Sequence, residues 1–294
     1  MTPFSKNLIE ITLRSRGPQR VFQKQLMRLA QVTGRPFGEF VLLNVQSKES
    51  AGAALYLKSV REASQVEKIC RKLAFRGWRF SQKKLKQSDW FDKWKEDYQI
   101  RPFGKKFIVV PQWRRQELKA GWRIPIYINP GGAFGSGEHE TTRLTVRLLE
   151  RAGAPFKNFF DVGTGTGILA VAAAKLGAGN IWVLDLDSAS VDAAEANLRL
   201  NRGPKPKTWR RSLETLRTGR KFEFVAANLV SDVLIENRRK LAALTRPGGR
   251  LAVSGILKSN LPGFLKAFKS PHLKKLCVLK GRCWSAVLYQ RLKN

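Results

Sequence analysis

The chain has 294 residues, of which 43% are hydrophobic and 26% are charged, a composition compatible with a folded protein. Its length exceeds that of one average domain, so we expect two domains. The charge is unusual, because 55 Lys and Arg residues against 22 Asp and Glu residues give a net charge of +33. Residues 1–127 carry 27 basic and 10 acidic side chains and residues 128–294 carry 28 and 12, so the excess is spread along the chain.

The cysteine, histidine and apolar patterns exclude several classes of protein. Three cysteines and two histidines lack the short spacings of a metal site, and the odd number of cysteines argues against a disulfide framework. The first residues lack the apolar core of a signal peptide, and no apolar run approaches the roughly 20 residues of a membrane span. We expect a soluble, cytoplasmic protein with neither a metal nor a membrane partner.

The positive charge bears on possible partners. A field of this sign concentrates polyanions near the surface, so nucleic acid, a ribonucleoprotein particle or an acidic protein face are candidate partners. The alternative is that the charge serves solubility alone, because no single block of the sequence stands out as a binding arm.

Residues 1–85 predict a small α+β domain. Alternating or short apolar runs indicate strands, and apolar residues at helical spacing indicate helices. The predicted strands cover residues 8–13, 40–45, 53–57 and 78–80, and the predicted helices cover residues 21–29 and 66–73. The order βαββαβ is typical of the split ferredoxin-like arrangement, which serves recognition more often than catalysis.

Residues 86–127 are predicted to be a connector between domains. Their aromatic residues Trp90, Trp94, Trp113 and Trp122 lie among many lysines and arginines, and prolines break the stretch into short pieces. A basic stretch with interleaved aromatic rings can stack nucleic-acid bases. The alternative is that the rings pin the connector onto a core.

Residues 128–294 alternate between predicted strands and helices, which indicates a mostly parallel, doubly wound α/β sheet. Strands are expected at residues 159–162, 181–184, 222–227 and 250–253, and helices at residues 168–176, 191–200 and 230–244. Two runs at residues 276–279 and 285–289 predict a closing hairpin.

A glycine loop follows the first of these strands, with glycines at Gly163, Gly165 and Gly167. Such a loop lets backbone approach a ligand at the start of a helix, and we expect a Cβ at Gly163 to intrude on that ligand. The spacing differs from the dinucleotide fingerprint, which disfavours nicotinamide binding. Asp161 before the loop suits a ligand with an ammonium group, and Asp185 at the end of the next strand is placed to accept hydrogen bonds from ribose hydroxyls. The alternative is a tight turn that serves structure only.

A second glycine-rich segment, residues 129–137, precedes a predicted helix. Four glycines within seven residues indicate a flexible loop that ends in a capped helix. Simple capping is the alternative to a functional role for Thr141 and Thr142. His139 is a possible general base, although a lone histidine in a loop is more often incidental.

The motifs together resemble the ribosomal protein L11 methyltransferase family. The resemblance rests on the strings NPGGAFGSGEHETT, DVGTGTGILAVAAAKLGA, LDLD, AANLV and PGGRLAVSGIL, and on DWFDKWKEDYQIRPFGKKFIVVPQW upstream of them. It implies a Rossmann-like methyltransferase domain behind a smaller N-terminal ferredoxin-like domain that recognises substrate. It also implies methyl transfer from S-adenosylmethionine to lysine or other amino groups of a ribosomal protein. By this resemblance Thr142, Gly163, Asp185 and Asn228 contact the cofactor, and we add Asp161 and Gly165 of the loop.

The sequence departs from the family pattern at four positions. Asn129 stands where the family usually has aspartate, and Glu138 and Glu140 flank His139 where threonine and proline are usual. Glu223 replaces an aspartate in the strand before Asn228. The high positive charge is also unusual for the family, so the resemblance supports the cofactor more firmly than the substrate.

Asn228 is the candidate catalytic residue, because it follows a strand at the edge of the sheet where ligands bind. Enzymes that methylate planar amides or adenine usually follow such an asparagine with Pro-Pro-aromatic, but here Leu229, Val230 and Ser231 follow. The absence of a stacking ring favours an aliphatic amine as the methyl acceptor. An RNA methyltransferase and a non-catalytic, RNA-associated protein that binds S-adenosylmethionine remain the alternatives.

Overall fold

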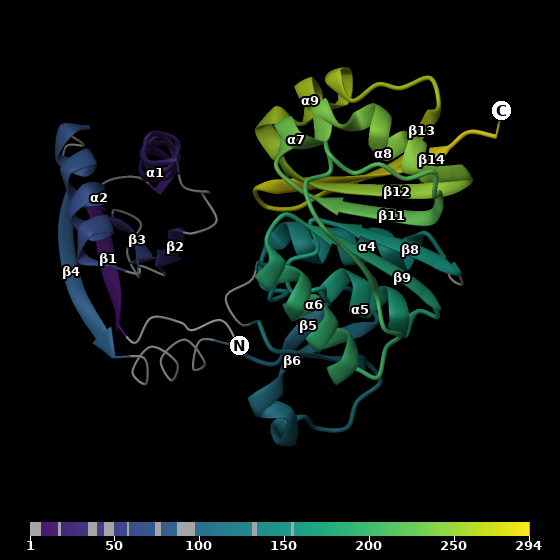
Figure 1. Ribbon diagram of the computed structural model, residues 1–294, viewed down its shortest axis with the longest axis horizontal. Coiled ribbons are helices and arrows are strands. Elements are labelled where there is room, and N and C mark those ends of the chain that lie inside the picture. Colours follow the sequence, from purple (N-terminus) through teal and green to yellow (C-terminus); the bar gives the residue numbers. More distant parts are fainter. Residues whose placement is uncertain are drawn as a thin grey trace. The chain divides into compact units, whose positions relative to one another are not determined.

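The structure is a computed structural model, and it describes residues 7–16, 19–34, 40–43, 50–57, 59–73, 78–86, 98–130, 134–153 and 156–293. The chain forms two compact units, Met1–Tyr98 and Gln99–Asn294 (Figure 1). The predicted aromatic connector therefore does not stand apart, because its part from residue 99 onward belongs to the larger unit. Trp90 and Trp94 lie outside the described residues.

The smaller unit contains one antiparallel sheet of four strands with two helices. In chain order its elements are β1 (Asn7–Arg16), α1 (Gln19–Thr33), β2 (Phe40–Leu43), β3 (Ser50–Leu57), α2 (Val60–Lys72) and β4 (Trp78–Lys86). The strands lie in the order β2-β3-β1-β4, and every pair is antiparallel. The apolar faces of both helices pack with the sheet in one core, which includes Ile11, Leu26, Leu55 and Val66. The element order is the βαββαβ order that the sequence pattern predicts.

The larger unit begins with a small three-stranded sheet. Its elements are β5 (Arg101–Phe103), β6 (Phe107–Pro111), the 3-10 helix η2 (Gln112–Glu117) and β7 (Ile124–Ile128). Phe103, Phe107 and Ile126 are completely buried in the same core as the helices of the following sheet. This burial explains why the stretch belongs to the larger unit rather than to a separate connector.

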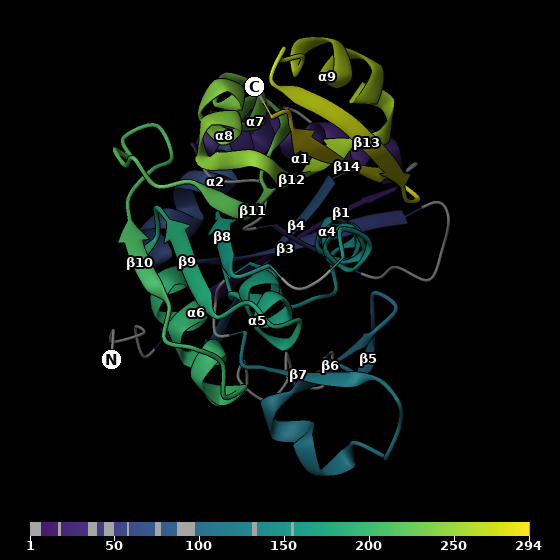
Figure 2. The ribbon, with the colours of Figure 1, turned by 90° about the vertical axis from the view of Figure 1, so that its right-hand side faces the viewer.

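The main sheet has seven strands, and Figure 2 shows how they lie beside one another. They are β8 (Asn158–Val162), β9 (Asn180–Asp185), β10 (Lys207–Arg210), β11 (Phe222–Asn228), β12 (Thr245–Leu257), β13 (Leu273–Lys280) and β14 (Trp284–Arg291). Their order in the sheet is β10-β9-β8-β11-β12-β14-β13. The pairings from β10 to β12 are parallel, whereas β14 is antiparallel to both of its neighbours. The predicted parallel α/β sheet with a closing hairpin is thus confirmed.

Helices cover both faces of this sheet (Figure 2). One face carries α4 (Glu140–Arg151), α5 (Ile168–Lys175) and α6 (Ser188–Leu200), and the other carries α7 (Ser231–Glu236), α8 (Arg238–Leu244), η3 (Lys258–Asn260) and α9 (Leu261–Ala267). The prediction of a single helix over residues 230–244 is wrong in one respect, because the chain forms two helices that are divided at Asn237. The buried side chain of Asn237 donates a hydrogen bond to the Val233 carbonyl oxygen at 3.0 Å. Because this side chain offers the backbone carbonyl an alternative partner, it favours a break in the helix. Among the described helices, none is long and apolar enough to cross a membrane.

Candidate cofactor site

The candidate site residues meet at one edge of the main sheet. Strand β8 contains Asp161 and lies between β9, which ends at Asp185, and β11, which ends at Asn228. Because these three strands are parallel, their carboxyl ends share the edge where open α/β sheets bind ligands. The fold therefore brings together side chains from three segments that are far apart in the sequence.

The glycine loop after β8 is held by backbone hydrogen bonds. The N–H groups of Gly163 and Thr164 donate to the Leu184 carbonyl oxygen at 2.8 and 3.0 Å. Gly163 and Gly165 have φ angles of +71° and +52°, in the left-handed region that favours glycine.

The space around these two glycines shows what a side chain at either position would meet within the protein. A Cβ at Gly163 would meet the side chain of Leu229, and one at Gly165 would meet the Phe134 carbonyl oxygen. A side chain at Gly163 thus meets an obstacle within the protein itself, and its expected intrusion on the ligand stays a prediction. The sequence pattern shows the need for glycine, but only the fold shows its packing partner.

The second glycine-rich segment lies directly on the glycine loop. The Thr166 N–H donates to the Phe134 carbonyl oxygen at 2.8 Å, and the Thr166 hydroxyl donates to the Gly135 carbonyl oxygen at 2.5 Å. Residues 131–133 are outside the described part of the chain. The described end of the segment is therefore anchored to the loop, although the sequence alone predicts flexibility.

Asp161 is buried beneath the loop, with only 1% of its surface exposed. Its Oδ2 accepts a hydrogen bond from the Thr164 hydroxyl at 2.9 Å, whereas its Oδ1 has no hydrogen-bond partner among the described residues. Burial raises the pKa of this carboxyl to about 7, although the Thr164 hydroxyl and the nearby Ala170 N–H favour the charged form. An unpaired acceptor in such a place is costly unless a ligand donates to it.

Asp185 links the end of β9 to the glycine loop. Its Oδ2 accepts the Gly165 N–H at 2.9 Å and its Oδ1 accepts the Asp187 N–H at 3.1 Å. A carboxylate has about four acceptor positions, so both oxygens can still accept from ligand hydroxyls. The adjacent Leu186 exposes 76% of its surface and presents an apolar side chain next to this carboxylate.

Asn228 lies against the first turn of α4. Its Nδ2 donates to the Thr142 hydroxyl at 3.4 Å, a long contact that leaves the amide oxygen available. Ser254, opposite Asn228 in the neighbouring strand β12, donates through its hydroxyl to the Thr141 carbonyl oxygen at 3.2 Å. Sequence reasoning missed Ser254, which lies where the parallel pairing of β11 with β12 ends.

His139, rather than either threonine, caps α4. Its Nδ1 lies 2.8 Å from the Thr141 hydroxyl and accepts the Thr141 N–H at 3.4 Å. The imidazole packs between the rings of Phe134 and Trp284, with centroids 5.5 and 5.3 Å away. Burial lowers the pKa of His139, against the opposing effect of Glu140. The alternative in which Thr141 and Thr142 cap the helix is wrong, because both are buried inside the first turn.

Glu140 holds the closing hairpin against α4. Its carboxylate accepts the backbone N–H groups of Arg282, Cys283 and Trp284 at 2.5, 2.8 and 3.0 Å. Burial works against ionisation, but these three bonds outweigh it and lower the pKa of Glu140. A residue that departs from the family pattern therefore has a defined structural contact in this chain.

Two other departures also form contacts. Glu138 pairs with Arg101 of β5 at 3.0 Å. Glu223 pairs with Arg246 at 2.9 Å and accepts the Lys157 N–H at 2.5 Å. Among the described residues, no group of three or more His, Cys, Asp or Glu side chains is arranged to hold a metal ion.

A parallel sheet that ends in an antiparallel hairpin, with a glycine loop and two acids at its carboxyl edge, defines a Rossmann-like methyltransferase domain. The family model for ribosomal protein L11 methyltransferase (PrmA) matches residues 27–291. The chain belongs to this family.

Several proteins of the same name are similar to this chain. The ribosomal protein L11 methyltransferase of Symbiobacterium thermophilum is 34% identical over 204 residues, which are 69% of this chain and 66% of that protein. The protein of that name from Thermoanaerobacter pseudethanolicus is 32% identical over 205 residues, again 66% of its length. The match thus spans slightly less than two thirds of these relatives. A solved structure of ribosomal protein L11 methylase from Lactobacillus delbrueckii subsp. bulgaricus is 29% identical, with a TM-score of 0.61, and covers 67% of this chain and 100% of its own.

Proposed function

We propose that this protein transfers methyl groups from S-adenosylmethionine to amino groups of ribosomal protein L11. The observation that carries the proposal is the convergence of Asp161, Asp185 and Asn228 beside a glycine loop at one edge of the sheet. Family membership supports the same function, because the relatives carry the name of this activity.

The donor set fits the proposed cofactor. The unpartnered Oδ1 of Asp161 suits an ammonium group such as the one on the methionine part. Asp161 is 1% exposed, so direct contact requires a local movement of the glycine loop. Asp185 suits the ribose hydroxyls, and Gly163, Gly165 and Thr142 line the path between the two acids and Asn228 in this proposal. When bound, the cofactor supplies a methyl group that a sulfonium centre has activated.

We assign the orientation of the acceptor amine to Asn228. Its amide oxygen can accept a hydrogen bond from an amine, because its Nδ2 already faces Thr142. A free lysine has a pKa of about 10.4, and the amine must lose its proton before it reacts. Desolvation and a neighbouring positive charge favour the neutral amine, so the proposal needs no dedicated base. Holding the two reactants together could supply about 7–11 kcal/mol of the barrier reduction.

His139 fits this view as a structural residue. Its Nδ1 faces the start of α4, and its ring packs against Phe134 and Trp284. The residues after Asn228 provide no aromatic ring, and Val230 is instead an exposed apolar side chain. An aliphatic amine, a lysine side chain or a chain N-terminus, suits this surrounding better than a planar base.

We propose that residues 1–85 recognise the protein substrate. They form most of a unit with its own core, and every candidate cofactor contact lies in the other unit. A ribosomal substrate would place the enzyme in the cytoplasm. Contact with ribosomal RNA is a second candidate role, favoured by the net charge of +33.

The experiment combines the protein with labelled S-adenosylmethionine and purified ribosomal protein L11, followed by protease or nuclease treatment and mass mapping of the label. We expect label on amino groups of the protein and its loss in Asn228→Ala. Label that is removed by nuclease would identify an RNA methyltransferase instead. No label in any fraction, with cofactor bound, would favour the non-catalytic alternative.

A further inference from the structure

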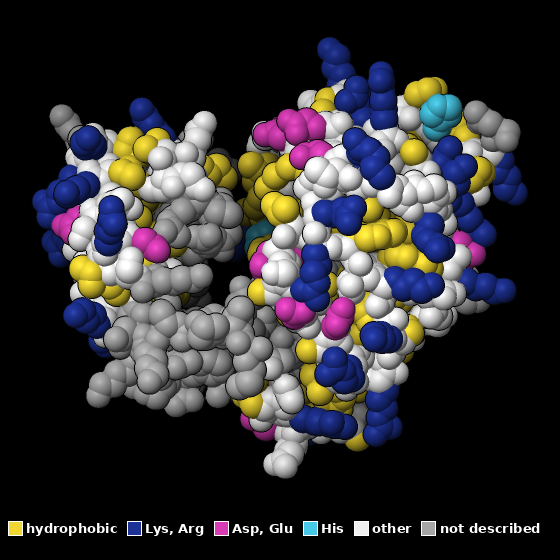
Figure 3. All heavy atoms as spheres, viewed as in Figure 1, with side chains coloured by type: hydrophobic (Ala, Val, Ile, Leu, Met, Phe, Trp, Pro, Cys, Tyr) yellow, Lys and Arg dark blue, Asp and Glu magenta, His cyan; other side chains and the backbone are white. Residues whose placement is uncertain are grey.

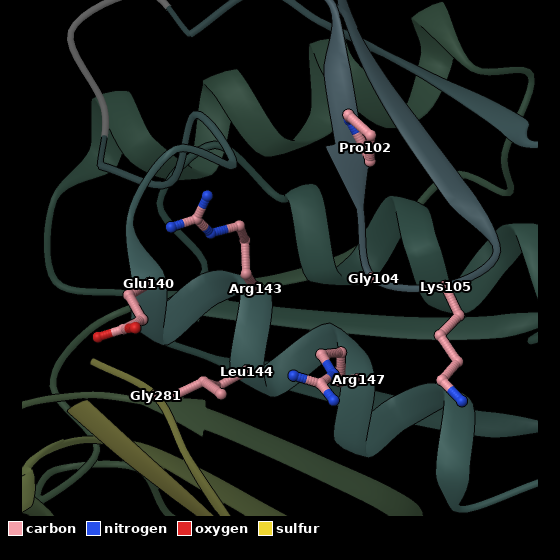
Figure 4. A pocket seen from close by; sticks show the side chains of 8 residues that line it. All are labelled: Pro102, Gly104, Lys105, Glu140, Arg143, Leu144, Arg147 and Gly281. Atoms are coloured by element: carbon pink, nitrogen blue, oxygen red, sulfur yellow. The ribbon is translucent and has the colours of Figure 1, made fainter. Parts of the chain in front are cut away.

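A basic pocket lies on the outer side of α4, and its lining residues differ from the candidate cofactor contacts. Its volume is about 360 Å³, and its walls come from α4, the turn after β5 and the tip of the closing hairpin (Figure 4). The residues that matter here are Gly104, Lys105, Glu140, Arg143, Arg147 and Gly281. Arg143 and Arg147 are four residues apart on α4 and therefore share one face of the helix.

Among the described residues, the cations of this pocket are not used in hydrogen bonds or ion pairs of their side chains, although Arg143 interacts electrostatically with Glu140. The side chains of Lys105, Arg143 and Arg147 form no hydrogen bond or ion pair within the part of the chain that the structure describes. The neighbouring carboxylates are already engaged with backbone: Glu140 accepts N–H groups of the closing hairpin, and Glu150 accepts the Lys105 and Lys106 N–H groups at 2.7–2.9 Å. Three positive side chains against Glu140 leave the lining with an excess of positive charge, which suits an anionic ligand.

An exposed indole lies beside the same turn. Trp122 exposes 74% of its surface and is the one exposed tryptophan among those that the structure describes. The guanidinium of Arg123 lies 4.4 Å from the centroid of the Trp122 ring. Arg123 itself is fixed, because its Nη1 donates to the carbonyl oxygens of Gly104 and Lys105 at 3.2 and 2.6 Å. The indole is therefore supported by an anchored cation and presented to solvent.

Gly104 and Lys105 join these two features. Both residues line the pocket, and both accept hydrogen bonds from the arginine that supports Trp122. We propose that the pocket and the Trp122 ring together bind a single-stranded polynucleotide, with one backbone phosphate at Arg143, a second at Arg147 and a base stacked on Trp122.

The combination favours a polynucleotide over an acidic peptide. Arginine pairs bind phosphate well, and every nucleobase has a face that can stack on an exposed indole. An acidic peptide would use the cations but would gain nothing from the ring. The Lys and Arg side chains spread over the visible face of the larger unit in Figure 3 would add a general attraction for polyanions. The proposal is independent of methyl transfer, because its residues lie outside the candidate cofactor site.

The test measures binding of a fluorescent single-stranded RNA 12-mer by anisotropy at several salt concentrations. Trp122→Ala should weaken binding about tenfold, within the contribution of one base–aromatic stack, and Trp122→Phe should retain most of the affinity. Arg143→Ala/Arg147→Ala should reduce the slope of log affinity against log salt by about 1.4, since each phosphate contact with a single strand contributes about 0.7.

The matched control is the double variant Arg211→Ala/Arg239→Ala. It also removes two positive charges, from an exposed position in the loop after β10 and from an exposed position on α8. It should change the slope by less than half as much. A second probe is poly-L-glutamate of equal charge, whose binding should not depend on Trp122. Equal effects of the two double variants, or no effect of Trp122→Ala on RNA binding, would overturn the proposal. Equal dependence of both probes on Trp122 would also overturn it and would point to an acidic protein partner.

Discussion

Replacing Gly165 by alanine should damage the site far more than the same change at Gly163. At Gly165 the new methyl group would run into the Phe134 carbonyl oxygen, which is backbone and cannot rotate away. At Gly163 it would meet the end of the Leu229 side chain, which can change rotamer. Both residues have positive φ, so the conformational cost of a side chain is common to the two variants.

The size of the difference follows from the contacts that must break. Left-handed backbone costs an alanine about 1–2 kcal/mol. Gly165→Ala must in addition displace the segment at Phe134, which breaks the hydrogen bonds from the Thr166 N–H and hydroxyl. Each such bond contributes about 1 kcal/mol. We therefore expect the free energy of unfolding to fall by about 3–4 kcal/mol in Gly165→Ala and by about 1–2 kcal/mol in Gly163→Ala.

Urea unfolding of both variants measures this difference, and calorimetry with S-adenosylmethionine measures its effect on the site. In the Leu229→Ala background, the substitution Gly163→Ala should cost no more than the about 1–2 kcal/mol of the left-handed backbone, because the side chain that must move aside is gone. The same background should not reduce the loss of unfolding free energy in Gly165→Ala. Equal losses in the two single variants, or relief of Gly165→Ala by Leu229→Ala, would refute the packing assigned to the loop.

Further predictions concern Asp161, Glu140 and the smaller unit. The pKa of Asp161 is raised to about 7 by burial, so its carboxyl favours the folded state when protonated, and stability should fall as the pH rises from about 4 to about 7. Urea unfolding across this range should show that Asp161→Asn lacks this fall. The pKa of Glu140 is lowered, so its stabilisation is complete above its usual value and is lost as the pH falls through the lower folded value. Glu140→Gln should therefore lower the unfolding free energy by about 1 kcal/mol at pH 7, and thermal melts should show a smaller difference from the wild type in acid. Deleting residues 1–98 should leave S-adenosylmethionine affinity unchanged by calorimetry but abolish transfer to ribosomal protein L11; undiminished transfer would contradict the recognition role.

The sequence predicts the features that depend on local pattern. The glycine spacing from Gly163 to Gly167 and the acids at the ends of β8 and β9 identify the loop and its edge, because a strand, a turn and a helix follow each other directly there. Parallel order then follows from the alternation of strands and helices. These signals need no knowledge of distant contacts.

The features that the sequence does not predict depend on tertiary contacts. The backbone N–H groups that donate to Glu140 lie more than 140 residues further along the chain, in the tip of the closing hairpin. His139 is fixed by Trp284 on one side, which no local pattern around it can show. The sequence pattern separates residues 86–127 from the α/β domain because their short strands look irregular, whereas the burial of Phe103 and Phe107 places this stretch in the core of that domain.

The most direct test of the proposed site is a calorimetric titration of S-adenosylmethionine into the full-length protein and into Asp185→Ala. Asp185 accepts the Gly165 N–H at 2.9 Å and is assigned the ribose hydroxyls, so it connects the loop to the ligand. We expect the wild type to bind and the variant to bind at least tenfold more weakly, as expected from roughly 1.5–3 kcal/mol for a hydrogen bond to a charged group. Unchanged affinity in a variant that melts like the wild type would contradict the placement of the cofactor at this edge of the sheet.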